Sequence, residues 1–120
     1  MQAKDHVALW GTGTPLREFL HVDDLATALL CLMERYSGTG HVNVGSGEEI
    51  SIKDLASLMQ KVTGFQGKIA FDDSKPDGAP RKLLDSSHMR ALGWKPSISL
   101  EEGLAQTYAW YNEGAMRKRA

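Results

Sequence analysis

The sequence predicts a small α+β domain that is mainly helical and has a few very short strands. Apolar residues recur at helical spacing in segments 23–36, 51–63 and 99–111, whereas the strand-like stretches between them are only four or five residues long. A length of 120 residues, with 42% apolar and 24% charged residues, suits one domain over 1–120 with a modest core.

Three short strands are expected. His6–Trp10 alternates weakly and ends at a glycine, His41–Val44 ends at Gly45, and Gly67–Phe71 follows a glycine-bounded turn. From Asp72 to Arg81 the chain has no apolar period, so a long polar loop is expected there.

Two helices have clear signals at their ends. Ser51 with Asp54 three residues on predicts a capped start, and Gly64 predicts the end of that helix. Ser99 and Glu102 predict the start of the last helix, whose shared apolar face is expected to comprise Leu100, Leu104, Tyr108 and Tyr111. A short helix over Ser86–Leu92 is expected to end at Gly93.

The helix expected over Asp23–Tyr36 is the most apolar of the chain. Asp23 or Asp24 is expected to cap its start, and His21 just before them is expected to make a structural hydrogen bond there. Additional apolar residues widen its stripe, namely Ala26, Ala28, Leu30 and Cys31. This helix is therefore expected to be buried on more than one side.

The stretch WGTGTPLREFLHVDD, from Trp10 to Asp24, is a candidate anion site. Glycines and a proline limit the freedom of the turn before Arg17, whose planar fork of donors suits phosphate or carboxylate. The alternative is a surface arginine paired with Glu18, Asp23 or Asp24, and the residues alone leave both interpretations open. The GTGT sequence lacks the third glycine of a dinucleotide loop and is predicted to form a turn.

The polar loop contributes more cations, Lys75, Arg81 and Lys82. A long loop of this kind suits closure over a phosphorylated ligand, although such composition is also typical of a solvated turn.

Charge and cysteine content exclude several classes. Fourteen basic and fifteen acidic residues give a net charge of −1, which offers no electrostatic case for nucleic acid or a membrane surface. No apolar run approaches the roughly 20 residues of a membrane span.

The lone Cys31 is expected to pack as a small hydrophobe in a reducing, cytoplasmic compartment. The four histidines have no metal-ligand spacing, so no metal site is expected.

Three stretches carry a resemblance to a known family: WGTGTPLREFLHVDDLA, VNVGSGEEISIKDLA and FDDSKPDGAPRKLLDSSHMRALGW. They resemble the C-terminal half of extended short-chain dehydrogenase/reductases, and within these the GDP-L-fucose synthases. The resemblance implies the substrate-binding part of an extended Rossmann-type fold without its dinucleotide-binding domain. It also implies that Met1 is an internal methionine of a longer parent and that Met1–Lys4 is the end of a helix.

The same resemblance implies that Trp10, Arg17, Asp77 and Lys82 bind a GDP-sugar, with Arg17 at the diphosphate. The family uses NADP(H) and a Tyr-x-x-x-Lys pair. In this chain the residues four positions after the tyrosines are Gly40, Asn112 and Ala115. No catalytic or cofactor-binding residue is therefore assigned.

Two functions are expected from these observations. The first is the GDP-sugar-binding part of an epimerase-reductase that converts GDP-4-keto-6-deoxymannose to GDP-L-fucose with NADPH and is not competent alone. The second is a binding module that docks to a separate dinucleotide-binding chain or to itself. A truncated product with no independent role is a further alternative.

Overall fold

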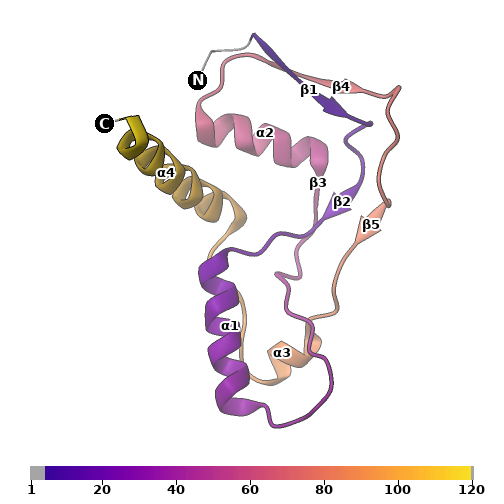
Figure 1. The fold of residues 1–120 in the computed structure, drawn as a ribbon. Coiled ribbons are helices and arrows are strands. Elements are labelled where there is room, and N and C mark those ends of the chain that lie inside the picture. The colour runs from indigo at the N-terminus through magenta and orange to yellow at the C-terminus, as the bar shows by residue number, and fades with distance from the viewer. Residues whose placement is uncertain (1–4, 120) are drawn as a thin grey trace.

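The computed structural model describes residues 5–119, and within this range it has four helices and five short strands (Figure 1). This confirms the predicted α+β class. The helix end expected over Met1–Lys4 lies outside the described residues.

One small sheet joins segments that are distant in the sequence. Strand β1 (His6–Trp10) pairs in parallel with β4 (Lys68–Asp72), so that Trp10 lies opposite Asp72. Both strands were predicted to within one residue. A parallel pair needs a long connection, and here it includes α1 and α2.

The second sheet was not predicted. Its central strand is β2 (Leu16–Arg17), which pairs antiparallel with β3 (Ile50–Ser51) and parallel with β5 (Arg81–Lys82). Strands of two residues leave no hydrophobic period in the sequence, which is why pattern analysis misses them.

Helix α1 (Val22–Arg35) begins with a different cap from the one expected. His21 is the N-cap, and its Nδ1 accepts a hydrogen bond from the backbone N–H of Asp23 at 3.1 Å. The structural role predicted for His21 is confirmed, whereas Asp24 lies inside the helix and is buried. The prediction of burial on more than one side is wrong, because the buried residues are only Asp24, Ala28 and Cys31.

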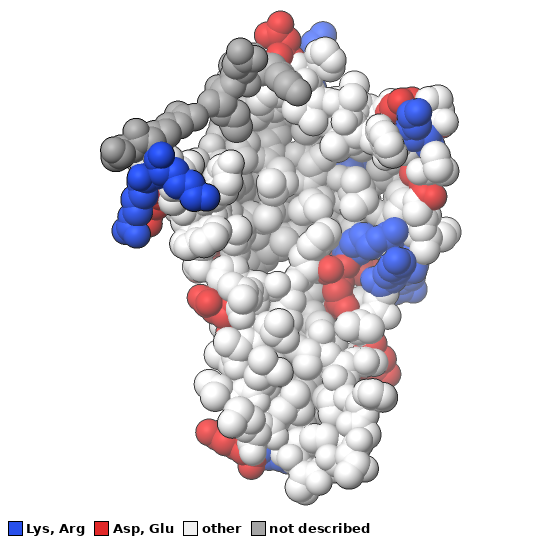
Figure 2. Space-filling view, in the orientation of Figure 1, with Lys and Arg blue, Asp and Glu red and all other residues white. Residues whose placement is uncertain are grey.

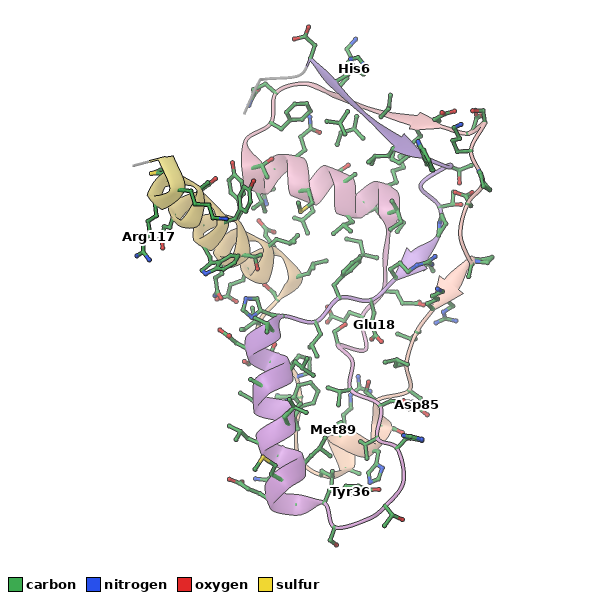
Figure 3. The ribbon with its side chains drawn as sticks, viewed as in Figure 1. His6, Glu18, Tyr36, Asp85, Met89 and Arg117 are labelled. Atoms are coloured by element: carbon green, nitrogen blue, oxygen red, sulfur yellow. The ribbon has the colours of Figure 1, made fainter. Side chains whose placement is uncertain are left out.

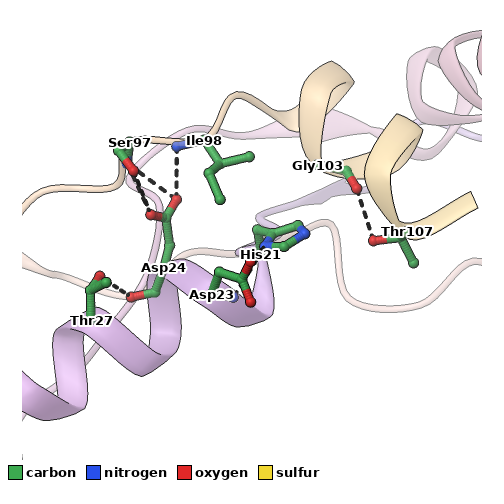
Figure 4. Close-up of polar contacts among 8 residues, drawn as sticks. All are labelled: His21, Asp23, Asp24, Thr27, Ser97, Ile98, Gly103 and Thr107. Carbon is green, nitrogen blue, oxygen red and sulfur yellow. Dashed lines mark hydrogen bonds and ion pairs between the residues drawn. The ribbon is translucent and has the colours of Figure 1, made fainter. Parts of the chain in front are cut away.

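The Asp24 carboxylate joins α1 to the segment before α4 (Figure 4). It accepts hydrogen bonds from the backbone N–H of Ile98 at 2.9 Å and from both the N–H and the hydroxyl of Ser97. Burial by itself would raise the pKa of Asp24, but these donors outweigh it and lower the pKa.

Helix α2 (Ile52–Thr63) starts and stops as predicted, and helix α4 (Leu100–Arg119) starts as predicted. The Ser51 hydroxyl accepts from the N–H of Asp54 at 3.0 Å, and Gly64 follows in a left-handed conformation with φ of 71°. Ser99 caps α4 in the same way through Glu102. On the predicted apolar face of α4, Leu100, Leu104 and Tyr108 are half-buried, whereas Tyr111 is 59% exposed.

The strand predicted over His41–Val44 is wrong, because this segment is irregular and pairs with no strand among the described residues. Val42 and Val44 instead pack against the core. That core lies between α1 and α3 (Ser87–Ala91), and Figure 3 shows Met89 pointing from α3 toward α1. Its buried apolar members are Ala28, Cys31, Met89 and Trp94.

The molecule is thin and extended. Its principal extents are 52 × 41 × 20 Å, and its radius of gyration of 17.5 Å exceeds the roughly 14 Å typical of a compact chain of this length. Among the described residues no helix is long and apolar enough to cross a membrane.

Candidate anion-binding site

The central strand of the second sheet places two cations side by side. Arg17 on β2 is the register partner of Lys82 on β5, and residues in register project from the same face. Like charges that lie directly opposite one another across a ladder destabilise it. An anion placed between the two side chains would offset this repulsion.

Backbone carbonyls hold the Arg17 guanidinium on one side. Its Nη1 donates to the carbonyl oxygens of Leu16 and Ala79, each at 2.7 Å. Within residues 5–119 these are the hydrogen bonds made by the guanidinium, and they come from Nη1 alone. The other guanidinium nitrogens are therefore available to donate hydrogen bonds to a ligand's oxygens.

The carboxylates that were considered as partners for Arg17 bind elsewhere. Glu18, near the centre of the molecule in Figure 3, accepts from the N–H of Gly47 at 2.9 Å and of Leu84 at 3.1 Å. Asp24 binds Ser97 and Ile98. The surface ion pairs proposed as the alternative for Arg17 are not formed with these residues.

Trp10 stands at the end of β1 with 73% of its surface exposed. The ammonium of Lys75 lies 5.4 Å from the centre of its ring, within the range of a cation–π contact. An exposed indole beside a cationic loop can stack on a planar group of a ligand.

Asp77 binds the turn that precedes Arg17. Its Oδ1 accepts from the backbone N–H of Thr12 at 2.8 Å, and its Oδ2 accepts from the Thr12 hydroxyl at 2.6 Å. These two bonds, first the side-chain one and then the backbone one, lower the pKa of Asp77. The carboxylate is thus held in its charged form.

Arg81 has a structural contact. Its Nε donates to Glu49 Oε1 at 2.5 Å, and this pair raises the pKa of Arg81. Figure 2 shows basic side chains gathered over the region of β2 and β5, with carboxylates beside them. A cavity of about 370 Å³ is lined by residues that include Phe19, Leu58 and Leu100 but none of the four predicted site residues.

The Gly11–Pro15 turn leads into β2 rather than into a helix. A dinucleotide loop places its pyrophosphate at a helix N-terminus. The Gly11–Pro15 residues therefore do not fit a dinucleotide. They connect β1 to β2 as a turn, as predicted. Among the described residues, no group of three or more His, Cys, Asp or Glu side chains could hold a metal ion.

Thr12 and Glu18 organise the site through contacts that were not predicted. Thr12 lies 65 residues from Asp77, and Glu18 lies 66 residues from Leu84. Local patterns carry no information on contacts at such separations. The only sequence hint of these contacts was the density of polar residues around Thr12 and Asp77.

Comparisons with known proteins show which family this chain resembles. The model of the NAD dependent epimerase/dehydratase family matches residues 1–45. GDP-L-fucose synthase 1 of Arabidopsis thaliana is 60% identical, over 89% of this chain and 33% of that protein. GDP-L-fucose synthase of Escherichia coli strain K12 is 48% identical, over 94% of this chain and 38% of that protein.

A solved structure of the same kind of protein has a similar fold. A GDP-L-fucose synthetase from Naegleria fowleri, in a structure with NADP bound, superimposes with a TM-score of 0.86 at 28% identity, over 92% of this chain and 36% of that one.

The chain is therefore similar to the extended short-chain dehydrogenase/reductases, and its residues 1–45 match the NAD dependent epimerase/dehydratase family. Within that class it is similar to a C-terminal part of the GDP-L-fucose synthases. It spans about a third of the length of the relatives it matches.

Proposed function

We propose that this chain supplies the GDP-sugar-binding residues of a GDP-L-fucose synthase-like epimerase-reductase. The observation that carries the proposal is the register pairing of Arg17 with Lys82, together with an Arg17 guanidinium held from one side by carbonyls. Two adjacent cations suit a diphosphate, because charge-assisted hydrogen bonds to phosphate are among the strongest in proteins.

In this proposal the four predicted residues belong to one site. Arg17 and Lys82 bind the diphosphate, the exposed indole of Trp10 contacts the nucleotide-sugar, and Asp77 belongs to the loop that borders the site. They contribute orientation and binding energy, whereas the bond-making groups would come from a dinucleotide-binding domain with NADP(H). We accordingly expect no turnover of GDP-4-keto-6-deoxymannose by the 120-residue chain with NADPH.

A titration with GDP, followed by two-dimensional NMR, tests the site, and UDP serves as the control. GDP is expected to shift the signals of Trp10, Arg17 and Lys82. Arg17→Gln should weaken binding about tenfold or more, since a hydrogen bond to a charged group contributes about 1.5–3 kcal/mol. Lys68→Gln on β4 removes an exposed lysine away from the β2–β5 pair and should leave the affinity unchanged.

Two results would contradict this function. A well-dispersed spectrum that does not respond to GDP would remove the binding role from this chain. Equal affinities of the Arg17→Gln and Lys68→Gln variants would mean that GDP binds elsewhere. Equal binding of UDP would retain a diphosphate site but remove the preference for GDP.

A second candidate function is a docking module, and a specific observation favours it. Helix α1 exposes an apolar stripe comprising Val22, Leu25, Leu29, Leu30 and Met33. We propose that this stripe binds a dinucleotide-binding α/β domain on a separate chain. The family match over residues 1–45 includes α1, and the relatives are about three times as long.

The charges beside the stripe disfavour a second copy as the occupant. The exposed charged residues at its two ends are Asp23, Glu34 and Arg35, and the Arg35 guanidinium donates to the carbonyl of Leu92 at 2.8 Å. Parallel pairing of two α1 helices would bring Asp23 against Asp23 and Glu34 against Glu34. A partner with basic residues around an apolar patch fits better, and a concentration-dependent dimer in gel filtration would favour the second copy instead.

The predictions of one domain over 1–120 and of a cytoplasmic location are kept as proposals. The first is supported by the carboxylates of Glu18 and Asp24, which join distant segments of the chain. The second is supported by a lone cysteine that is buried and free.

A further inference from the structure

Three separate segments meet at the carboxylate of Glu18, the residue that directly follows Arg17. Its Oε1 accepts a hydrogen bond from the backbone N–H of Leu84 at 3.1 Å, and its Oε2 accepts one from the N–H of Gly47 at 2.9 Å. Leu84 lies two residues beyond Lys82 of β5, and Gly47 lies shortly before β3. The Glu18 side chain therefore connects the three strands of the second sheet at the end where Arg17 lies.

The second sheet needs such a connection, because each of its strands is only two residues long. The pairing of β2 with β5 also places Arg17 opposite Lys82, and like charges in this position repel each other. So short a ladder has few backbone hydrogen bonds to oppose that repulsion. The bond from Leu84 to Glu18 adds one just beyond the two cations.

The turn before β3 leaves room for the Glu18 carboxylate only because residue 45 is a glycine. Gly45 is buried, and a β-carbon there would lie 2.5 Å from Oε1 and 2.7 Å from Oε2 of Glu18. Non-bonded atoms do not approach this closely unless one of them moves, so any other residue at position 45 would displace the carboxylate. The turn is thus shaped around it.

A second carboxylate fixes β5 on the other side of Lys82. Arg81 Nε donates to Glu49 Oε1 at 2.5 Å, and successive residues of a strand project to opposite faces. Within the part of the chain that the structure describes, the ion pairs that contain lysine or arginine are this one and Lys61–Glu101. The backbone is therefore held before and after Lys82, while its ammonium stays unpaired.

We propose that Glu18 is a positioning residue, which fixes the spacing of Arg17 and Lys82 so that the two cations bind the two phosphates of one diphosphate. Glu18 acts through the backbone and does not contact the ligand, since both of its oxygens already accept hydrogen bonds from N–H groups. The proposal rests on the diphosphate site proposed above. It adds Glu18, and Gly45 beside it, to the residues that select a diphosphate over a single phosphate.

Three variants of the 120-residue chain test the proposal. Glu18→Gln replaces one acceptor oxygen with an NH₂ group, which cannot accept from the N–H of Leu84 or Gly47. Gly45→Ala leaves the carboxylate charged but displaces it by steric contact. Glu48→Gln is the matched control, because Glu48 is an exposed glutamate next to the same turn.

Two measurements are made on each variant. Nuclear Overhauser contacts between Arg17 and Lys82, recorded without ligand, report whether β2 and β5 keep their register. Dissociation constants for GDP and for GMP report whether the two cations act together on a diphosphate. Melting temperatures and circular dichroism of all variants record any general loss of structure.

We expect Glu18→Gln and Gly45→Ala to weaken the contacts between Arg17 and Lys82 and to raise the dissociation constant for GDP about tenfold. The dissociation constant for GMP should be nearly unchanged, because one cation suffices to hold a single phosphate. Glu48→Gln should match the wild type in every measurement.

The outcomes separate this inference from the proposed function. Equal weakening of GDP and GMP, with a lower melting temperature, would make Glu18 merely structural and overturn the inference. So would Arg17–Lys82 contacts or a GDP affinity that Glu18→Gln leaves unchanged in a wild type that binds GDP. If the wild type binds neither nucleotide, but Glu18→Gln and Gly45→Ala alone lose the Arg17–Lys82 contacts, the positioning role stands and the GDP function fails.

Discussion

The side chain of Asp24 joins α1 to the segment before α4, which is far away in the sequence. It is 1% exposed, and its acceptors are used by Ser97 and Ile98, which lie 73 and 74 residues away. The sequence suggested a helix cap at this position, because aspartate near a helix start usually serves as one. His21 performs the capping, which leaves the Asp24 carboxylate free for a tertiary contact.

Replacement of Asp24 by asparagine should destabilise the fold. The amide has one acceptor oxygen and would place an NH₂ group against backbone donors, so we expect a loss of about 2 kcal/mol in the free energy of unfolding at pH 7. Urea denaturation measures it. Asp23→Asn is the control, since the Asp23 side chain is 74% exposed, and its effect should stay within about 0.5 kcal/mol.

The pH dependence of this effect has a definite sign. The pKa of Asp24 in the folded protein lies below its ordinary value of 3.8, so the carboxylate contributes stability at pH above that value. This contribution is lost as the pH falls through the lowered pKa. The difference between wild type and Asp24→Asn should therefore shrink on acidification, and a difference that grows below pH 3.8 would contradict the account.

At the scale of elements, the parts determined by neighbouring residues were predictable. Ser51, Gly64 and Ser99 mark helix ends through contacts within three or four residues, and the structure confirms all three. The strand over His41–Val44 failed because a strand needs a partner, which local sequence cannot supply. The same limit applies to the site, where Arg17 was recognisable but its register with Lys82 was not.

Helix α1 presents its apolar stripe on the side away from Ala28 and Cys31. The double variant Leu29→Gln, Met33→Gln should weaken docking to a separately expressed dinucleotide-binding domain of a relative, by about tenfold or more, because a buried apolar side chain contributes about 1.5–3 kcal/mol. Calorimetric titration measures this, and circular dichroism should stay unchanged since these residues are 52% and 81% exposed.

The control for docking is Met116→Gln, which alters an equally exposed methionine near the end of α4. The Met116→Gln variant should leave the affinity for the partner domain unchanged. If basic residues of the partner face Asp23 and Glu34, added salt should weaken docking. Equal affinities of the double variant and the control would exclude the stripe as the docking surface. A dimer of the wild type that the double variant abolishes would identify a second copy as the occupant.

At the scale of the whole molecule, the buried apolar core is confined to one end. The buried residues Ala28, Cys31, Met89 and Trp94 lie in the part built from α1 and α3, whereas α2 has no buried residue. The other part, with β1, β4, α2 and α4, is held by sheet pairing and by contacts such as Lys61–Glu101. Such parts of one chain can open with different free energies.

This distribution predicts that Met89→Ala acts mainly on one part of the molecule. Met89 is fully buried, so its truncation should cost about 2–5 kcal/mol, whereas Met33→Ala on the exposed side of α1 should cost less than about 0.5 kcal/mol. Native-state hydrogen exchange should show a greater loss of protection in α1 and α3 than in α2 and β4. Because Asp24 and Glu18 connect the two parts, a smaller loss should also reach the second part, and an equal loss at every amide would mean that the chain opens as one unit.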